Sequence, residues 1–310
     1  MAYQNVNTPV FYINVIEFLG STGVDIPDKF RTLPVNPSHV GSIDVPTESQ
    51  ALLTDSMDKF IFVLGHNIAS DNNIVMAGGI LDDATINVNT VSYSGFSLLK
   101  YTGDLTGITV DADVGSFVVG NTYTMSHSPD LSLTLTREYG GVKTIETKGG
   151  STLSNDFGSK PPAWGDLGAW ELGSADPKLS RSGRRIWDLS FSYLSAKDIM
   201  GAPELVDQSP ATAELGGGDA LTPNLVGLGW DSDDVDDNDS FAYNLMNHND
   251  FYSQVIHKTN GGQLPFIFQP DSSNNSPDAF AIAKLDMNSF KFEQVANGVY
   301  NIKLKIREVW

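Results

Sequence analysis

The sequence predicts a mainly β protein made of two β units, and three observations lead to this prediction. Many short segments alternate between apolar and polar residues, which is the period of a strand with one buried face. The chain holds 29 glycines and 15 prolines among many Asn, Asp, Ser and Thr residues, which favours numerous turns over long helices. Hydrophobic residues make up 40% of the chain, so a packed core can form and wholesale disorder is disfavoured.

The N-terminal part begins with an apolar, β-branched segment at 10–19, which predicts a first strand. Four prolines within 20–50 indicate an extended connection, so residues 1–39 are expected to form a strand and an arm. Residues 59–65 are a continuous apolar run of strand length, which predicts a strand buried on both faces. Further alternating segments separated by turn residues predict a sandwich of antiparallel strands over 40–150.

Residues 151–183 are rich in Gly, Ser, Pro and Trp, and we expect a loop that crosses between the two β units. Trp164 and Trp170 lie in this loop. The sequence leaves two uses open for their rings: a platform that stacks on a glycan, or an anchor that holds the loop against the β units. The anchor is favoured because exposed tryptophan is costly.

The second β unit is expected over 184–310, and its first strand over 184–194. The apolar face of this strand is expected to comprise Trp187, Leu189, Phe191 and Tyr193. An acidic loop over 200–240 and a helix over about 240–257 follow. The sequence therefore predicts a second β sandwich or barrel that carries one helix.

The last strand shows the clearest alternation in the chain. Apolar and basic residues alternate from Ile302 to Arg307, which predicts a strand with one buried and one solvated face. Trp310 follows this strand directly. Because chain ends fray unless they are held, we expect this aromatic end to dock against its own subunit or a neighbour.

The balance of charge disfavours nucleic acid as a partner. Acidic residues outnumber basic ones by 38 to 19, and the resulting net charge of −19 repels phosphate. Arg181, Arg184 and Arg185 form the densest basic cluster in this acidic chain. Guanidinium groups suit ion pairs across interfaces, so these arginines, with Arg307 and Trp310, are candidates for contact with a neighbouring copy. Pairing with carboxylates of the same chain is the alternative that the sequence leaves open.

The sequence offers no motif for catalysis, a metal or a cofactor. The absence of cysteine excludes disulfides, thiolate metal sites and cysteine nucleophiles. The acidic run at 231–240 fails the calcium-loop pattern, because Asp239 replaces the required glycine and Leu245 the required glutamate. No nucleophile elbow, phosphate loop or dinucleotide fingerprint is present. We therefore expect a protein that is not an enzyme; a polysaccharide hydrolase is the less favoured alternative, since an acidic chain offers many carboxylate pairs.

The sequence leads us to expect neither a membrane helix nor a secretory signal. No stretch approaches the roughly 18 apolar residues that a membrane helix needs, so membrane insertion is not expected. The first residues have neither the basic nor the apolar segment of a secretory signal.

Two segments taken together resemble structural proteins of tailed-bacteriophage tails. One is SGRRIWDLSFSYL at 182–194, and the other runs from GQLPFIFQPD at 262–271 to the closing strand. They are most similar to distal-tail or minor tail proteins, and the resemblance covers mainly residues 180–310. The segment FIFVLGHN at 60–67 is also similar to the galactose-binding-type jelly rolls of phage structural proteins.

This resemblance implies a fold, an assembly and a place in the virion. The implied fold is a jelly-roll-like domain at 40–150 and a tail-tube-like β domain at 184–310, without catalysis or a cofactor. The implied assembly is a ring of identical subunits, often six, at the distal tail or baseplate of the virion, put together in the host cytoplasm. It would link the tail tube to the tip and contact tube, hub and fibre proteins. The alternative is a carbohydrate-binding module that adheres to a glycan on the host surface.

Overall fold

The computed structural model describes residues 6–33, 36–53, 57–68, 74–82, 86–88, 95–131, 133–138, 144–154, 184–199, 249–276 and 279–309. Within these residues the protein is mainly β, as the sequence predicts. Thirteen strands form one antiparallel sheet, two more form a separate hairpin, and the α-helices are two short segments. The arrangement is consistent with a β-sandwich-like fold.

The strands follow the chain in this order. The first seven are β1 (Val10–Asn14), β2 (Ser38–Asp44), β3 (Lys59–His66), β4 (Val75–Leu81), β5 (Ile86–Val88), β6 (Gly95–Val114) and β7 (Ser116–Thr124). The others are β8 (Thr134–Glu138), β9 (Thr144–Glu146), β10 (Thr152–Ser154), β11 (Arg184–Ser195), β12 (Phe266–Gln269), β13 (Ala281–Leu285), β14 (Phe292–Ala296) and β15 (Val299–Glu308). The helical segments are α1 (Val15–Ser21), α2 (Ala196–Ile199), the 3-10 turns η1 (Asp28–Phe30) and η2 (Thr47–Ala51), and the π-helical turn η4 (Tyr252–His257).

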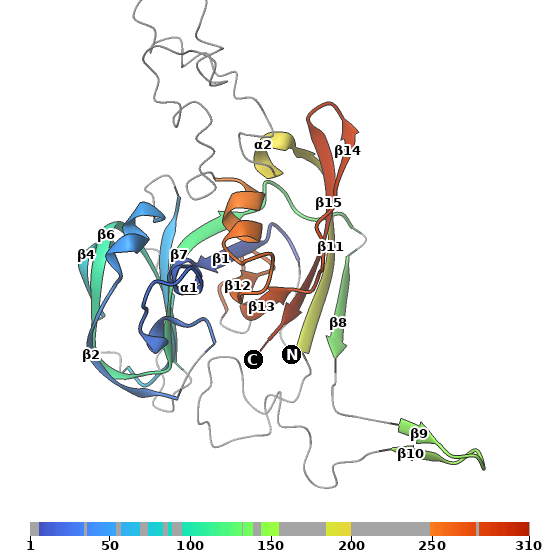
Figure 1. The fold of residues 1–310 in the computed structure, drawn as a ribbon, viewed down its shortest axis with the longest axis horizontal. Coiled ribbons are helices and arrows are strands. Elements are labelled where there is room, and N and C mark those ends of the chain that lie inside the picture. The colour runs from blue at the N-terminus through green and yellow to red at the C-terminus, as the bar shows by residue number, and fades with distance from the viewer. Residues whose placement is uncertain are drawn as a thin grey trace, which may run out of the picture.

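The sheet is continuous across the two units that the sequence predicts. Its strand order is β2-β6-β3-β7-β1-β12-β13-β15-β11-β8, with β4 and β5 on β6 and β14 on β15. β1 pairs with β7 on one side and β12 on the other, so it joins an N-terminal half (β2–β7) to a C-terminal half (β8 and β11–β15) (Figure 1). Residues 134–138, which the sequence places in the first unit, pair as β8 with β11.

The strand predicted over 10–19 is correct only to Asn14, where the chain turns into α1. Asn14 caps this helix: its Oδ1 accepts the backbone N–H of Glu17 at 3.2 Å, and its Nδ2 donates to the Glu17 carboxylate at 3.3 Å. The first of these bonds satisfies a backbone N–H that the start of a helix leaves unpaired. The Glu17 carboxylate also accepts the backbone N–H of Thr32 at 2.9 Å, so the buried acid has its partners. The cap therefore outweighs the β-branched character of the two residues after it.

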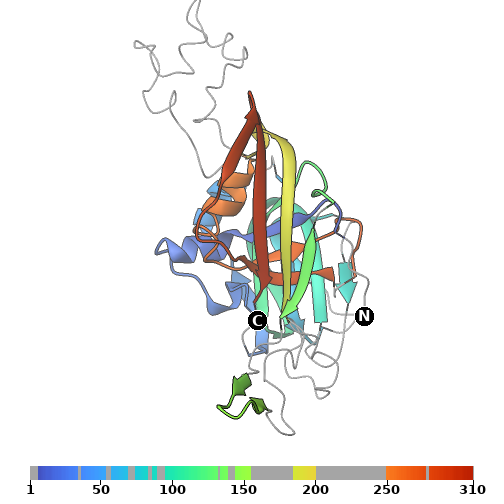
Figure 2. The ribbon, with the colours of Figure 1, turned by 90° about the vertical axis from the view of Figure 1, so that its right-hand side faces the viewer.

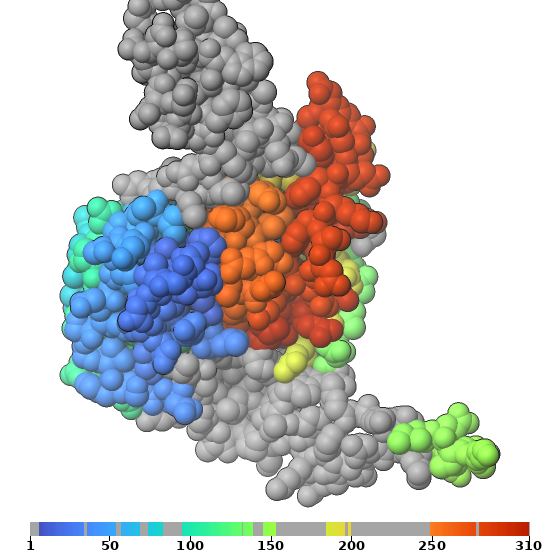
Figure 3. All heavy atoms as spheres, in the orientation of Figure 1, coloured from blue at the N-terminus to red at the C-terminus, as the bar shows by residue number. Residues whose placement is uncertain are grey.

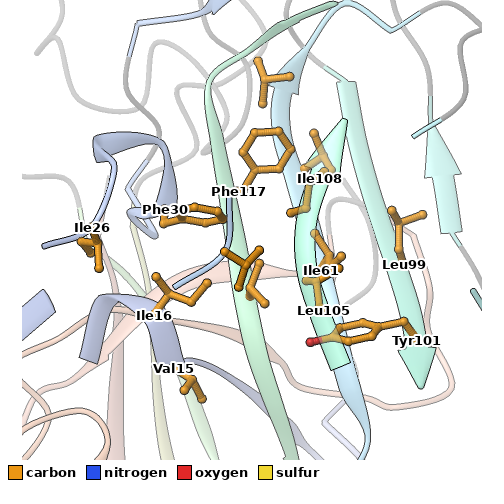
Figure 4. Packing of buried hydrophobic residues seen from close by; sticks show 14 of the residues in the cluster. Val15, Ile16, Ile26, Phe30, Ile61, Leu99, Tyr101, Leu105, Ile108 and Phe117 are labelled. Carbon is orange, nitrogen blue, oxygen red and sulfur yellow. The ribbon is translucent and has the colours of Figure 1, made fainter. Parts of the chain in front are cut away.

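β6 is the strand that builds the sandwich of the N-terminal half. It is 20 residues long, and its first part pairs with β3 while its last part pairs with β2. The space between these two parts is filled by apolar side chains from β3, β6 and β7, and α1 and η1 cover it (Figure 4). Phe30 of η1, for example, packs on Phe117 of β7 with ring centroids 6.1 Å apart.

The C-terminal half has its own core, formed by β11, β12, β13 and β15 with η4 packed on it. Phe251, Val255 and Ile256, which lie in the helix predicted over 240–257, are buried in this core. The helical part that the structure describes begins at Phe251; residues 240–248 and the acidic loop over 200–240 lie outside the described residues. The two halves are in direct contact, as the blue and orange atoms in Figure 3 show.

Candidate interaction surfaces

The outer face of β11 and β15 is polar. Ile302, Leu304 and Ile306 are buried on the inner face of β15, and Lys303 and Lys305 point away from it, so the predicted alternation is confirmed. β8, β11 and β15 lie side by side in Figure 2. This face therefore combines a row of basic residues with the serines of β11.

Arg185 lies inside the protein and pairs with its own chain, which corrects its assignment as a contact for a neighbouring copy. Its guanidinium donates to both carboxylate oxygens of Glu308, at 3.1 and 2.8 Å, and to the carbonyl of Phe280 at 2.8 Å. The group also lies 5.2 Å from the ring of Trp187. Both charged side chains are almost fully buried, so a two-pronged ion pair closes the end of the C-terminal core.

Arg307 also pairs within the chain, although at the surface. It lies 3.4 Å from Glu138 and 3.4 Å from Asp286, and Asp286 also pairs with Lys305 at 3.3 Å. Arg184 is half-buried and stands opposite Glu138 in the pairing of β11 with β8. Pairing within the chain, the alternative left open by the sequence, therefore holds for Arg185 and Arg307.

The other predicted interaction residues are Arg181, Trp310, Trp164 and Trp170, and all four lie outside the described residues. The glycan platform proposed for the two tryptophans therefore stays a prediction.

Tyr193 is exposed, which corrects its predicted place on the apolar face of β11. The pairing of β11 with β15 shifts register between Phe191 and Leu194, so a β-bulge inserts an extra residue. Leu194 takes the buried position, and Tyr193 is 80% exposed with a φ of 61°. A bulky residue at positive φ is strained. The backbone N–H of Tyr193 donates to the side chain of Asn301 at 3.1 Å, which holds the bulge in place.

A hollow of about 1010 Å³ lies beside this bulge, between β11, β14, β15 and the turn that precedes β14. Its polar lining comprises Asp130, Ser190, Ser192, Ser289, Lys291, Glu293, Asn301 and Lys303. Asp130 is held in place, because it accepts the hydroxyl of Ser192 at 2.8 Å and its backbone N–H donates to the carbonyl of Ser190 at 2.8 Å. No sequence pattern points to this site, because its residues come from three distant segments.

Three outer strands of the described part of the sheet, β4, β8 and β14, carry exposed apolar side chains. Among the described strands β4 pairs only with β6, and β8 pairs only with β11. On β4, Val75, Ile80 and Leu81 are exposed, and Ile80 retains 72% of its accessible surface. Leu135 on β8 and Leu131 just before it are also exposed. β4 and β8 lie at opposite sides of the molecule (Figure 1).

Two buried titratable groups have structural partners. His66 is fully buried; its Nε2 lies 2.9 Å from the hydroxyl of Ser97, and its Nδ1 accepts the backbone N–H of Ile68 at 3.2 Å. Burial lowers the pKa of His66 to about 4, so the ring is neutral at pH 7. Lys258 is 1% exposed and donates to Gln254 at 2.7 Å; burial lowers its pKa to about 7, and the charge of Asp250 opposes this shift.

Comparison with known protein families, curated proteins and solved structures finds no match. In the part of the chain that the structure describes, no group of three or more His, Asp and Glu side chains is placed to hold a metal ion. None of the helices described is long and apolar enough to cross a membrane.

Proposed function

We propose that this chain is a structural subunit of a phage tail, and that copies of it associate head to tail into a ring at the distal tail or baseplate. The observation that carries the proposal is that two outer strands with exposed apolar residues, β4 and β8, lie at opposite sides of the sheet. A strand with an unpaired edge offers backbone groups to another chain. When the joined surfaces differ, as β4 and β8 do, repeated contacts close into a ring or extend into a filament.

The resemblance of residues 180–310 to distal-tail and minor tail proteins supports the ring over the filament. The charge of the chain adds a condition for assembly. Copies with a net charge of −19 repel one another, and salt screens this repulsion. An interface built on β4 and β8 is therefore expected to strengthen as the salt concentration rises, whereas an interface built on arginine–carboxylate pairs would weaken.

The oligomeric state tests the association. Light scattering coupled to gel filtration, at low and high salt, gives the mass, and negative-stain microscopy shows the ring directly. We expect a closed ring whose population grows with salt. A chain that stays monomeric at every protein and salt concentration would contradict the proposal.

Single substitutions test which surface is used. Ile80→Lys places a charge on β4, and Leu135→Lys places one on β8; both side chains are exposed, so the fold is expected to survive while the ring is lost. Val295→Lys is the matched control, since Val295 is an exposed apolar residue of β14, away from both strands. Loss of the ring in the control alone would place the interface elsewhere.

The place in the virion needs a separate experiment. Antibodies raised against the chain are expected to label the tails of phage particles produced from the genome that encodes it. Gold particles on the heads, or unlabelled particles, would overturn the assignment to the tail while leaving the ring itself standing.

A further inference from the structure

The hollow beside Tyr193 has a balanced charge, which is unusual in so acidic a chain. Its lining contains two carboxylates, from Asp130 and Glu293, and two ammonium groups, from Lys291 and Lys303. Lys291, Lys303 and Glu293 are exposed, and no ion pair joins them to another described residue. An anion in this hollow would face two carboxylates, and a cation would face two ammonium groups. The lining therefore disfavours a charged ligand of either sign.

The same lining suits a ligand that carries many hydroxyl groups. Ammonium groups donate hydrogen bonds, carboxylates accept them, and the hydroxyls of Ser190 and Ser192 and the amide of Asn301 do both. A sugar hydroxyl needs both kinds of partner. The volume lies at the upper end of the range for small-molecule sites, which leaves room for more than one sugar ring.

The strained backbone beside the hollow is independent evidence for a ligand site. Tyr193 keeps a positive φ that costs free energy, and the side chain that holds it there, Asn301, lines the hollow. Strained residues and β-bulges gather at ligand sites, where they direct side chains. Here the bulge fixes Asn301 from one side, and the bond from Ser192 fixes Asp130 from the other. Two polar groups of the site are thus oriented before a ligand arrives.

We propose that the hollow between β11, β14 and β15 binds a short stretch of a neutral glycan. The hollow is formed by residues of one chain, so this binding does not depend on the ring. A ring without sugar binding would overturn the glycan site alone, and a monomer that binds sugar would overturn the ring alone.

The test uses neutral trisaccharides as probes: maltotriose, mannotriose, galactotriose and triacetylchitotriose. Saturation-transfer NMR with the full chain detects binding up to millimolar concentrations, and titration calorimetry measures the affinity. We expect at least one of the four to bind, and inorganic phosphate and putrescine, as an anionic and a cationic probe, not to compete. Failure of all four sugars, or displacement of the bound sugar by either ion, would overturn the proposal.

Matched variants locate the site. Lys303→Ala and Glu293→Gln each remove a charged hydrogen-bonding partner, and each is expected to weaken binding about tenfold or more. The controls are Lys305→Ala, which changes a lysine two residues along the same face of β15 but outside the hollow, and Glu146→Gln, which changes an exposed glutamate of β9. The controls are expected to bind as the unsubstituted protein does. Equal binding by all four variants would show that the sugar binds elsewhere.

Discussion

β3 and β15 belong to the same sheet, yet they bury their side chains in different ways. Every residue of β3 is buried, whereas β15 is buried on one face and solvated on the other. β3 has a core on each side: Ile61 and Val63 face the space under α1, and Phe60 and Phe62 face an aromatic cluster that includes Tyr12 and Phe280. In β15 only the inner residues reach the C-terminal core.

This difference in burial determines whether the polar side chains of each strand bond to the protein or to water. Lys59 and His66, at the two ends of β3, are buried, and each is satisfied by a fixed partner: Lys59 donates to the carbonyl of Gly103 at 2.9 Å, and His66 lies against Ser97. On β15 the outer lysines remain in contact with water. A strand between two cores must satisfy every polar group within the protein, because an unpaired buried group costs free energy.

The largest expected effect on the free energy of unfolding comes from truncating two consecutive side chains on each strand to alanine. Ile61→Ala and Phe62→Ala are expected to lower the free energy of unfolding by about 2–5 and about 3–5 kcal/mol, because both faces of β3 are packed. On β15, Leu304→Ala is expected to cost about 2–5 kcal/mol and Lys303→Ala less than about 0.5 kcal/mol. Urea unfolding measures all four. A small effect for either residue of β3 would mean that one of its faces is not a core.

The ion pair at the end of β15 gives the next test. Glu308→Gln leaves the buried charge of Arg185 without its partner, and we expect a loss of about 3–5 kcal/mol. Replacing both groups, Arg185→Met with Glu308→Leu, is expected to restore stability, because no buried charge then remains. Arg307→Ala, on the solvated face of the same strand, is expected to cost less than about 1 kcal/mol. If Glu308→Gln and Arg307→Ala lowered the free energy of unfolding equally, the buried and solvated faces of β15 would not differ in how much their ion pairs contribute.

The lowered pKa of His66 predicts how the stability of the N-terminal half depends on pH. The folded state lowers its pKa to about 4, whereas the unfolded chain has a pKa of about 6.5. Between these values the unfolded state binds the extra proton, so stability is complete above pH 6.5 and falls as the pH drops towards 4. The expected loss is about 3 kcal/mol.

The variant His66→Gln separates this contribution from that of the carboxylates, which titrate in part of the same range. The difference in unfolding free energy between the native protein and the variant is expected to shrink as the pH falls from 7 to 4. A difference that stays constant with pH would show that His66 is accessible to protons in the folded state.

The burial of β3 and β15 could be predicted from the sequence alone. The continuous apolar run of β3 and the alternation of β15 are local patterns, and each predicted the burial of its strand correctly. β2, β4 and β14 were not foreseen. Gly41 interrupts the pattern of β2, and Gly78 and Gly79 interrupt that of β4. β14 is exposed along most of its length and so shows no buried face. These strands form by pairing with β6 or β15, which is a long-range effect.

The sites were harder to foresee than the strands. The partner of Arg185 lies 123 residues away, and only the register between β11 and β15 brings the two groups together. The hollow combines Asp130 with residues of β11, β14, β15 and the turn before β14, so no motif within one segment could predict it. Tyr193 continues the apolar alternation of β11 in the sequence, and the bulge that turns it outward depends on its pairing with β15.

The smallest expected effect concerns this bulge, where β11 departs from the regular pattern of its neighbour. Glycine tolerates a positive φ, whereas tyrosine is strained there, so Tyr193→Gly is expected to raise the free energy of unfolding by about 1 kcal/mol. Ser192→Gly, one residue earlier in the strand, is expected to lower it by about 2–4 kcal/mol instead, because glycine is disfavoured in a strand and the hydrogen bond to Asp130 is lost. If Tyr193→Gly destabilises the protein, the exposed ring contributes contacts that outweigh the strain. If it stabilises the protein as expected, the strain is retained at a net cost, which is the behaviour of a residue kept for binding rather than for folding.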